Sequence, residues 1–283
     1  MYKFGLIGYP LSHSMSKIIQ EAAFKSIGAE GTYDILETEQ EDLVDRLKYL
    51  RVNGYQGFNV TIPLKVPVTL FLSTFDNLAN VTGSVNTIKI LPDSTLVGYN
   101  TDVYGFVEAM PKEVQDEIKG QEIAILGSGG AARAVAVGLS VLKVKKLNFF
   151  VRNIVNAAEV IEMQRRNFPE VEMNCYQIDS LRDLSQYKMV VNTTPIGMRS
   201  KAMGLSPIDE SIVKTLKDDA IVYDLVYNPL KTELIKYAKK RGVRTIHGLD
   251  MLIYQGAKAF EIWTGKKPDI QAMKIAALEE MCN

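Results

Sequence analysis

The sequence predicts an α/β protein of two domains, each built on a mostly parallel β-sheet. Strand-like and helix-like segments alternate along almost all of the 283 residues, a pattern typical of βαβ units. A glycine-rich turn at residues 127–134 follows the apolar run 123–126 in mid-chain, and it indicates a strand that leads into a helix. Because a chain of this length can bury two separate cores, we expect a nucleotide-binding domain to follow a first domain.

The first domain is expected to contain three strands, two helices and a hairpin. The strands fall at residues 3–7, 32–36 and 57–60, and helical patterns at 16–27 and 40–53 lie between them. The hairpin strands fall at 84–90 and 96–99, on either side of the turn Pro92-Asp93-Ser94. These residue types favour a tight turn.

The second domain is expected to follow a helix that begins near Val103. Its strands fall at residues 122–126, 146–151, 171–176, 189–192, 221–224 and 244–247. The terminal stretches 249–263 and 269–282 have apolar residues at helical spacing. Because the chain has no linker-like segment, we expect the boundaries at helix junctions, with one domain comprising 1–102 and 248–283 and the other 103–247.

Composition argues against several classes of function. Lys plus Arg equals Asp plus Glu, at 33 each, so no net field would recruit nucleic acid or a membrane surface. Cys175 and Cys282 lie far apart without a neighbouring histidine pair, so we expect no metal site. The first residues indicate a strand rather than a signal peptide, and no apolar run approaches a membrane span. A cytoplasmic protein is expected.

The mid-chain turn fits the dinucleotide fingerprint. In Gly127-x-Gly129-x-x-Ala132, the first glycine makes a tight turn and the second lets the backbone approach a pyrophosphate. The small third residue lets the helix pack on the strand. Such turns also occur for steric reasons alone, but here the flanking strand and helix are both expected. The cofactor-binding positions in this loop are Gly127, Ser128, Gly129, Gly130 and Ala131.

The next strand ends without the acidic residue that usually holds the ribose of NAD. The sequence there is Phe149-Phe150-Val151-Arg152-Asn153. A guanidinium at Arg152 suits a 2′-phosphate, which it can grip with two hydrogen bonds. This position therefore favours NADP and disfavours S-adenosylmethionine, whose free ribose would again favour an acid. A solvated surface arginine is the alternative interpretation of Arg152.

Polar clusters follow several strands of the first domain. They contain Ser14 and Ser16, then Thr61 and Lys65, then Asn86, and finally the run Asn100-Thr101-Asp102. Each cluster alone is explained by helix caps and turns. Together they indicate a ligand crevice, because polar side chains at the carboxyl ends of strands line such a crevice in open α/β sheets. Hydroxyls, amides, one amine and one carboxylate suit a small polyhydroxylated acid.

At these residues the sequence resembles the shikimate dehydrogenase family, essentially from end to end. The matching motifs are Ser14-x-Ser16, Asn59-Val60-Thr61-x-Pro63-x-Lys65, Val85-Asn86-Thr87, Gly98-x-Asn100-Thr101-Asp102, the glycine loop, Asn192-x-Thr194-x-x-Gly197-Met198, residues 224–229 and residues 248–256. The resemblance implies a Rossmann-type cofactor domain, a substrate-binding domain, and reversible NADP-dependent reduction of 3-dehydroshikimate to shikimate in aromatic amino-acid biosynthesis. Only one arginine stands at the position of the usual phosphate clamp, so NAD use stays open.

The resemblance also implies a role for each matched residue. Lys65 would donate the proton to the developing alkoxide, and Asp102 would orient Lys65. Ser14 and Ser16 would bind the substrate carboxylate. The other substrate-binding positions are Thr61, Asn86, Tyr227 and Gln255, and the further cofactor-binding positions are Arg152, Thr193, Thr194, Met198, Gly248 and Met251.

Two other functions stay open at this point. A relative of the same fold could act on quinate with NAD or NADP, because the polar set does not distinguish the two ring acids. A non-catalytic sensor could bind the same ligands without turnover, although such a sensor has no need of Lys65 and Asp102. We expect the chain to be a monomer or a homodimer.

Overall fold

The computed structural model describes residues 1–199 and 202–282, and the chain divides into two compact units. Unit 1 comprises Met1–Gly105 and Ile253–Asn283, and unit 2 comprises Phe106–Leu252. Both divisions fall within helices, α4 (Thr101–Glu108) and α10 (Leu249–Thr264), whereas the sequence placed the domain limits at 102/103 and 247/248. The assignment of a ligand to each domain stays a prediction.

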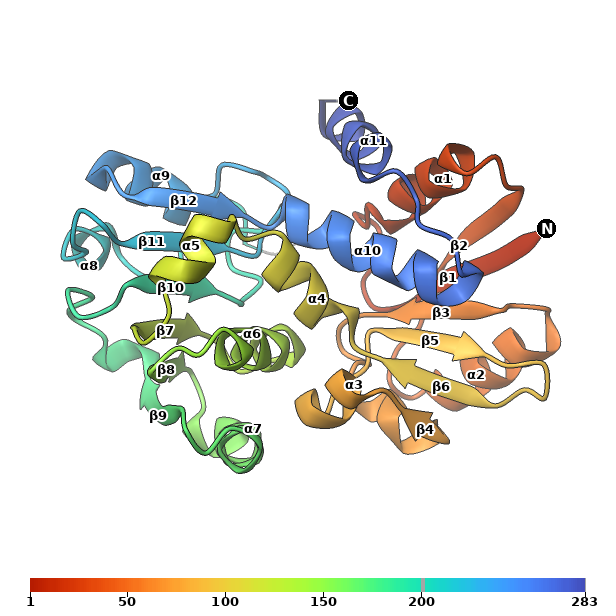
Figure 1. The fold of residues 1–283 in the computed structure, drawn as a ribbon, viewed down its shortest axis with the longest axis horizontal. Coiled ribbons are helices and arrows are strands. Elements are labelled where there is room, and N and C mark those ends of the chain that lie inside the picture. The colour runs from red at the N-terminus through yellow and green to blue at the C-terminus, as the bar shows by residue number, and fades with distance from the viewer. Residues whose placement is uncertain (200–201, 283) are drawn as a thin grey trace. The chain divides into compact units, whose positions relative to one another are not determined.

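Unit 1 contains a mixed sheet (Figure 1). Its strand order is β2-β1-β3-β5-β6-β4. The strands are β1 (Tyr2–Gly8), β2 (Gly31–Glu37), β3 (Gly57–Val60), β4 (Thr74–Phe75), β5 (Thr87–Ile90) and β6 (Leu96–Tyr99). β1 pairs with β2 and β3 in parallel, and β5 runs antiparallel to β3 and β6. As a result, β3 and β6 end at the edge of the sheet where β5 begins.

The helices of unit 1 include short elements that the sequence did not predict. They are α1 (Ser16–Ser26), α2 (Leu43–Val52), the 3-10 turn η1 (Pro67–Phe71), α3 (Asn77–Thr82) and α11 (Ile270–Cys282), besides the parts of α4 and α10. α1 packs against α11 (Figure 1). Aromatic rings fill the core beneath them: Phe4 stacks on Trp263 with the ring centroids 4.5 Å apart, and Phe24 stacks on Phe4.

Unit 2 is a doubly wound parallel sheet, which confirms the Rossmann-type prediction. Its order is β12-β11-β10-β7-β8-β9, and every pair is parallel. The strands are β7 (Glu122–Leu126), β8 (Lys146–Val151), β9 (Glu172–Gln177), β10 (Met189–Asn192), β11 (Ile221–Asp224) and β12 (Arg244–His247). The chain reverses direction across the sheet between β7 and β10, and in such folds the ligand binds beside that point.

The helices of unit 2 alternate with its strands, as a parallel sheet requires. They are α5 (Lys112–Glu117), α6 (Gly130–Val141), α7 (Ile154–Asn167), the 3-10 turn η2 (Ile178–Ser180), α8 (Glu210–Val213) and α9 (Glu233–Arg241). Figure 1 shows the strands of this sheet one below another, from β12 at the top to β9 at the bottom. The strands β7, β10 and β11 bury almost all of their side chains.

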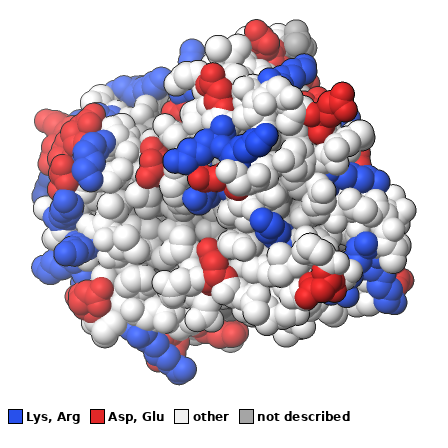
Figure 2. All heavy atoms as spheres, turned by 45° about the vertical axis from the view of Figure 1, so that its right-hand side comes forward, with Lys and Arg blue, Asp and Glu red and all other residues white. Residues whose placement is uncertain are grey.

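Basic and acidic side chains are interspersed over the face shown in Figure 2, which agrees with the balanced charge of the sequence. Among the described residues, no helix combines the length and apolar character needed to cross a bilayer. In the same part of the chain, no three acidic, histidine or cysteine side chains are placed so that they could share a metal ion.

Candidate functional site

One edge of the unit 1 sheet gathers the polar clusters that the sequence singled out. β1 ends at Gly8 and leads into the loop that carries Ser14 and Ser16, and β3 ends just before Thr61 and Lys65. In the β-ladder Asn59 pairs with Thr87, and Thr87 pairs with Tyr99. Asn86 and the run 100–102 therefore meet the end of β3, although they are far from it in sequence.

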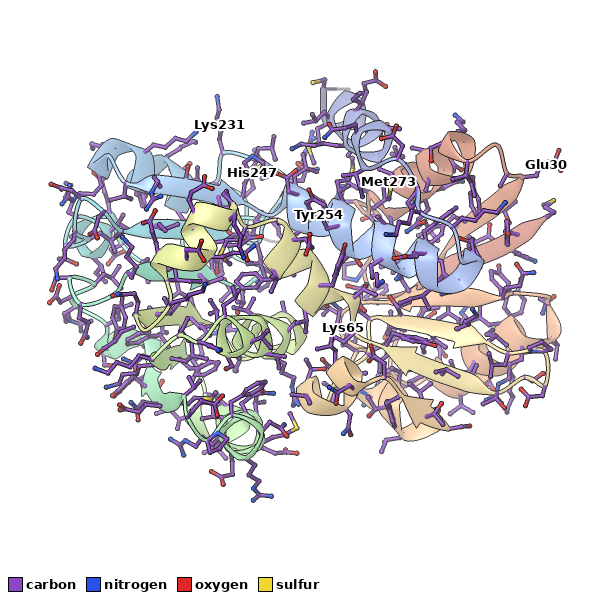
Figure 3. The ribbon with its side chains drawn as sticks, in the orientation of Figure 1. Glu30, Lys65, Lys231, His247, Tyr254 and Met273 are labelled. Carbon is purple, nitrogen blue, oxygen red and sulfur yellow. The ribbon has the colours of Figure 1, made fainter. Side chains whose placement is uncertain are left out.

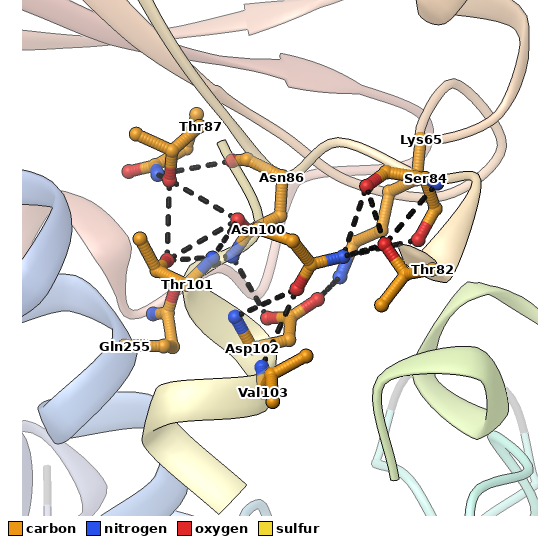
Figure 4. A network of polar contacts seen from close by, with 11 residues as sticks. Lys65, Thr82, Ser84, Asn86, Thr87, Asn100, Thr101, Asp102, Val103 and Gln255 are labelled. Atoms are coloured by element: carbon orange, nitrogen blue, oxygen red, sulfur yellow. Dashed lines mark hydrogen bonds and ion pairs between the residues drawn. The ribbon is translucent and has the colours of Figure 1, made fainter. Parts of the chain in front are cut away.

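Lys65, which is labelled in Figure 3, forms an ion pair with Asp102 at this edge (Figure 4). Lys65 Nζ lies 2.5 Å from Asp102 Oδ2. The side chains are 15% and 7% exposed, so the pair is largely shielded from water and from salt. An ammonium group has three N–H donors, which leaves Lys65 able to bind a ligand oxygen while it holds Asp102.

Two buried asparagines hold Asp102 in place. Asn86 Nδ2 donates to Asp102 Oδ1 at 2.9 Å, which occupies the carboxylate oxygen that Lys65 does not. Asn100 Oδ1 accepts the N–H groups of Asp102 and Val103 at 3.1 and 3.3 Å, so Asn100 caps the first turn of α4. Asp102 is thus fixed through both its side chain and its backbone.

Further hydrogen bonds extend this network across the edge (Figure 4). Asn86 Oδ1 accepts the N–H of Thr101 at 2.7 Å, and Gln255 Oε1 accepts from Asn86 Nδ2 at 3.3 Å. Gln255 comes from α10, so this helix completes the cluster. Asn100 Nδ2 donates to Thr82 Oγ1 and to the carbonyl oxygen of Ser84. Nearly every polar atom of the buried asparagines is therefore satisfied.

The two serines lie beside the start of α1. Ser14 and Ser16 are half-buried, and the Ser16 N–H donates to Ser14 Oγ at 3.3 Å. Thr61 is half-buried directly after β3, where its N–H donates to the carbonyl of Ile7 at 2.9 Å. The start of a helix with two hydroxyls is a suitable place for a carboxylate.

Four buried members of this network stand in motifs that the sequence singles out, although no ligand or positioning role was predicted for them. Asn59 Nδ2 donates to Thr87 Oγ1 at 2.9 Å, and Thr87 Oγ1 lies 3.2 Å from Thr101 Oγ1. The fourth member is Asn100, which donates to Thr82 and Ser84. Their place in apolar or turn-forming segments was the available signal, since a buried polar side chain needs partners.

The glycine loop of unit 2 has the tight turn that its motif predicts. Gly127 has φ +107°, and a Cβ atom there would lie 2.7 Å from Thr193 Oγ1. Both the backbone angle and this close approach require glycine. A Cβ at Gly129 would meet nothing within 4 Å, so the space over that backbone is open.

The start of α6 fits a pyrophosphate. Gly129 is the N-cap of α6 and supplies no side-chain hydrogen bond to the helix. The first N–H groups of a helix have no partners within it, and together with the helix dipole they favour an anion. The open backbone at Gly129 and the uncapped helix therefore suit the diphosphate of a dinucleotide, with Ser128, Gly130 and Ala131, all half-buried, around it.

Thr193 and Thr194 shape the neighbouring loop through their hydroxyls. Thr193 Oγ1 donates to the carbonyl of Leu126 at 2.7 Å, which ties the loop to the end of β7. Thr194 Oγ1 donates to Asn192 Oδ1 at 2.7 Å. Because both protons are used within unit 2, these threonines hold the loop beside Gly127, and their contact with a cofactor stays a prediction.

A buried carboxylate supports the same loop. Asp224, at the end of β11, accepts from Asn192 Nδ2 at 2.9 Å, from Thr232 Oγ1 at 2.6 Å and from the N–H of Val226 at 3.0 Å. Burial raises the pKa of Asp224 to about 6, and these three donors oppose the rise. Asp224 thereby joins the loops that follow β10 and β11.

The remaining predicted cofactor residues have different surroundings. Arg152 is exposed at the end of β8, Met198 is half-buried and Met251 is buried. A Cβ at Gly248 would lie 1.9 Å from the carbonyl oxygen of Leu225, so packing alone requires this glycine. The cofactor roles of all four stay predictions.

Tyr227 belongs to unit 2, whereas the other predicted substrate residues belong to unit 1. It is half-buried in the loop after β11. His247, labelled in Figure 3, ends β12 and is half-buried.

Known proteins are similar to this chain over nearly its whole length. Residues 6–88 match the family model described as the shikimate dehydrogenase substrate binding domain, and residues 248–278 match the shikimate 5'-dehydrogenase C-terminal domain. The chain is 41% identical to shikimate dehydrogenase (NADP(+)) of Methanocaldococcus jannaschii, over 98% of this chain and 96% of that protein.

Solved structures agree with these matches. The structure of shikimate 5-dehydrogenase from Thermus thermophilus in complex with NADP(H) and shikimate has a TM-score of 0.84 and 32% identity, covering 99% of each chain. Quinate dehydrogenase from Corynebacterium glutamicum in complex with NAD has a TM-score of 0.88 and 30% identity, covering 98% of this chain and 99% of that one.

Proposed function

Because the chain belongs to the shikimate dehydrogenase family, we propose that it catalyses the reversible NADP-dependent reduction of 3-dehydroshikimate to shikimate. This reaction serves the synthesis of chorismate and the aromatic amino acids. The observation that carries the proposal is the shielded ion pair of Lys65 and Asp102 within a cluster of hydroxyl and amide groups. Such a cluster suits a ring acid with several hydroxyls, and the lysine supplies the proton that ketone reduction requires.

Unit 1 binds the substrate in this proposal. Ser14 and Ser16 donate hydrogen bonds to the carboxylate beside the start of α1, while Thr61, Asn86 and Gln255 read the ring hydroxyls. The support for these roles is that Asn86 bonds both Asp102 and Gln255, which fixes the amide at the edge of the sheet. Tyr227 is proposed as a further substrate contact from unit 2.

Unit 2 binds NADP(H), which supplies the hydride when bound. Gly127–Ala131 and the start of α6 hold the diphosphate, and Arg152 holds the 2′-phosphate. Thr193, Thr194, Met198, Gly248 and Met251 surround the remainder of the cofactor. Exposure of Arg152 supports its role, because a guanidinium in solvent can reach a phosphate without leaving another partner.

Lys65 performs the proton transfer. Addition of hydride to the ketone carbon turns the carbonyl oxygen into an alkoxide, and an N–H of Lys65 stabilises that charge and then protonates the oxygen. In the reverse direction the neutral amine of Lys65 accepts the hydroxyl proton as hydride leaves the carbon. Asp102 orients the amine through the 2.5 Å contact.

Formation of NADPH from shikimate and NADP+, followed by absorbance, tests this function. We expect steady turnover with shikimate, and binding without turnover would support the sensor instead. A second candidate, oxidation of quinate, is favoured by the likeness to a quinate dehydrogenase at 30% identity. Comparing kcat/KM for shikimate and quinate with NADP+ and with NAD+ decides between the two.

A further inference from the structure

Asn100 lies directly before α4 and is only 1% exposed. Its Oδ1 atom accepts the N–H groups of Asp102 and Val103. Its Nδ2 atom donates to the carbonyl oxygen of Ser84 at 2.9 Å, and to Thr82 Oγ1 and Ser84 Oγ at 3.0 and 3.1 Å (Figure 4). One amide therefore connects the start of α4 with the segment between α3 and β5.

The same segment holds the backbone of Lys65. The N–H of Val85 donates to the carbonyl oxygen of Lys65 at 2.8 Å. The Ser84 carbonyl and the Val85 N–H belong to one planar peptide group, which is completely buried. This peptide accepts from Asn100 on one side and donates to Lys65 on the other. Asn100 is thus linked to both members of the ion pair through their backbones.

The contacts of the Asn100 side chain fix which way its amide points. Two N–H donors face its oxygen, and a carbonyl oxygen, which can only accept, faces its nitrogen. A rotated amide would place donors against donors. The position therefore needs a side chain that accepts toward α4 and donates toward Ser84. A serine is long enough for the first of these contacts only.

We propose that Asn100 is a positioning residue that sets the distance and direction between the Lys65 amine and the Asp102 carboxylate, an inference that rests on the proposed function. Proton transfer requires the amine within hydrogen-bond reach of the alkoxide, and a displacement of about 1 Å can slow a reaction about 10²-fold. Loosening of either backbone should therefore slow the chemical step more than it weakens binding.

The substitution Asn100→Ala removes both sets of contacts. We expect kcat for shikimate oxidation to fall about 10- to 100-fold. The Kd values for shikimate and NADP+, measured by calorimetry, should stay near those of the wild type, because the predicted carboxylate and diphosphate contacts remain. Binding of both ligands also shows that the variant is folded. Wild-type kcat in such a variant would overturn the proposal.

Asn100→Ser separates the two sides of the link. Serine is a favoured N-cap, so its hydroxyl can still accept an N–H at the start of α4, but it does not reach the Ser84 carbonyl. We expect this variant to resist chemical unfolding better than Asn100→Ala and yet to lose a similar part of kcat. Wild-type kcat in Asn100→Ser would show that the cap alone suffices and would overturn the proposed link.

Asn148→Ala is the matched control. Asn148 is also a buried asparagine, at 3% exposure, and its Nδ2 atom donates to the Tyr187 hydroxyl at 2.9 Å within unit 2. Its loss should lower stability toward chemical unfolding and leave kcat unchanged. An equal fall of kcat in both variants would make the Asn100 effect a general consequence of losing a buried amide, and would contradict the positioning role.

A double-mutant cycle shows whether Asn100 acts through the ion pair. In a Lys65→Ala background, Asn100→Ala should lower kcat little further, because the amine that it positions is gone. A residue with a merely structural role would lower kcat by the same factor in both backgrounds. That additive result would contradict the proposal.

Turnover by the wild-type chain distinguishes failure of this inference from failure of the proposed function. Oxidation of shikimate with the same kcat in wild type and in Asn100→Ala would contradict the inference alone. Binding of shikimate and NADP+ by the wild-type chain without turnover would overturn the proposed function, and with it the inference.

Discussion

Lys65 is the side chain whose removal should most affect the chemical step. Without a proton donor beside the alkoxide, Lys65→Ala should lower kcat by about 10²–10⁴-fold, the usual contribution of general acid catalysis. The KM for shikimate should change far less, because the carboxylate and hydroxyl contacts remain. Steady-state kinetics in both directions measures the effect, and near-normal turnover would contradict the assignment.

The control for this substitution is an exposed lysine of the same unit. Lys48 has a side chain that is 69% exposed, and its partner is Asp45. Lys48→Ala should leave kcat unchanged. Asp102→Asn should resemble Lys65→Ala in kcat, because it removes the charge that orients the amine while it keeps the size of the side chain.

Arg152 should determine the preference between the two nicotinamide cofactors. Arg152→Ala should raise the KM for NADP+ roughly tenfold, as expected for loss of a charge-assisted hydrogen bond, and should alter the KM for NAD+ little. Arg166→Ala is a suitable control, because Arg166 is also exposed, with its side chain 78% accessible. Equal effects of Arg152→Ala on both cofactors would show that Arg152 is only a surface charge.

Asp224 joins the loops after β10 and β11, and its contribution to the stability of the folded chain should vary with pH. The pKa of Asp224 is raised to about 6 in the folded chain, against about 3.9 in an unfolded one. Between these values the folded state binds more protons, so this carboxyl lowers stability as pH rises from about 4 to about 6. The full cost of ionised Asp224, above about pH 6, is ~3 kcal/mol, at about 1.36 kcal/mol per unit.

Asp224→Asn should remove this pH dependence. Its amide cannot ionise, and its oxygen can still accept from Asn192 and Val226. The stability of the variant relative to wild type, from chemical unfolding of the full chain, should therefore be more favourable at pH 8 than at pH 4. Taking the difference between the variant and the wild type at each pH removes the contributions of other titratable groups. One of these groups is Glu117, whose lowered pKa makes its own contribution to stability increase as pH rises. A difference that is constant with pH would contradict the assigned cause.

Strands were the elements that the sequence predicted best. β7, β10 and β11 coincide with the expected ranges, because a strand covered on both faces is a continuous apolar run with polar ends. β3, β6, β8 and β12 have the expected bounds too. β4 and α3 were missed. β4 has only two residues, both exposed, and α3 is too short to show a helical period.

The same reasoning explains which parts of the candidate site were predictable. Lys65 and Asp102 stand in polar clusters directly after strands, so their meeting could be expected from the edge that parallel strands share. Tyr33 is an aromatic residue in an ordinary strand pattern, and its hydroxyl donates to Asn59. Only the three-dimensional pairing of β2, β1 and β3 brings the two side chains together.

The two units should respond to different ligands when hydrogen exchange is measured along the whole chain. NADP+ alone should protect the amides of 127–133 and 193–198 most strongly, because they form the glycine loop and its supporting loop. Shikimate alone should protect 14–16, 61–65 and 100–102 most strongly. At a ligand concentration about 100 times the Kd, openings that require release of the ligand should slow about 100-fold.

This pattern of protection tests which unit binds which ligand, and it does not rely on turnover. Glucose 6-phosphate, an anion with neither a nicotinamide nor a shikimate ring, is the control ligand and should protect neither set. Strongest protection of 61–65 by NADP+, or of 127–133 by shikimate, would exchange the two assignments. The fold argues against that exchange, because the open backbone of Gly129 and the uncapped start of α6 suit a diphosphate, whereas the hydroxyls and amides around Lys65 suit a ring acid.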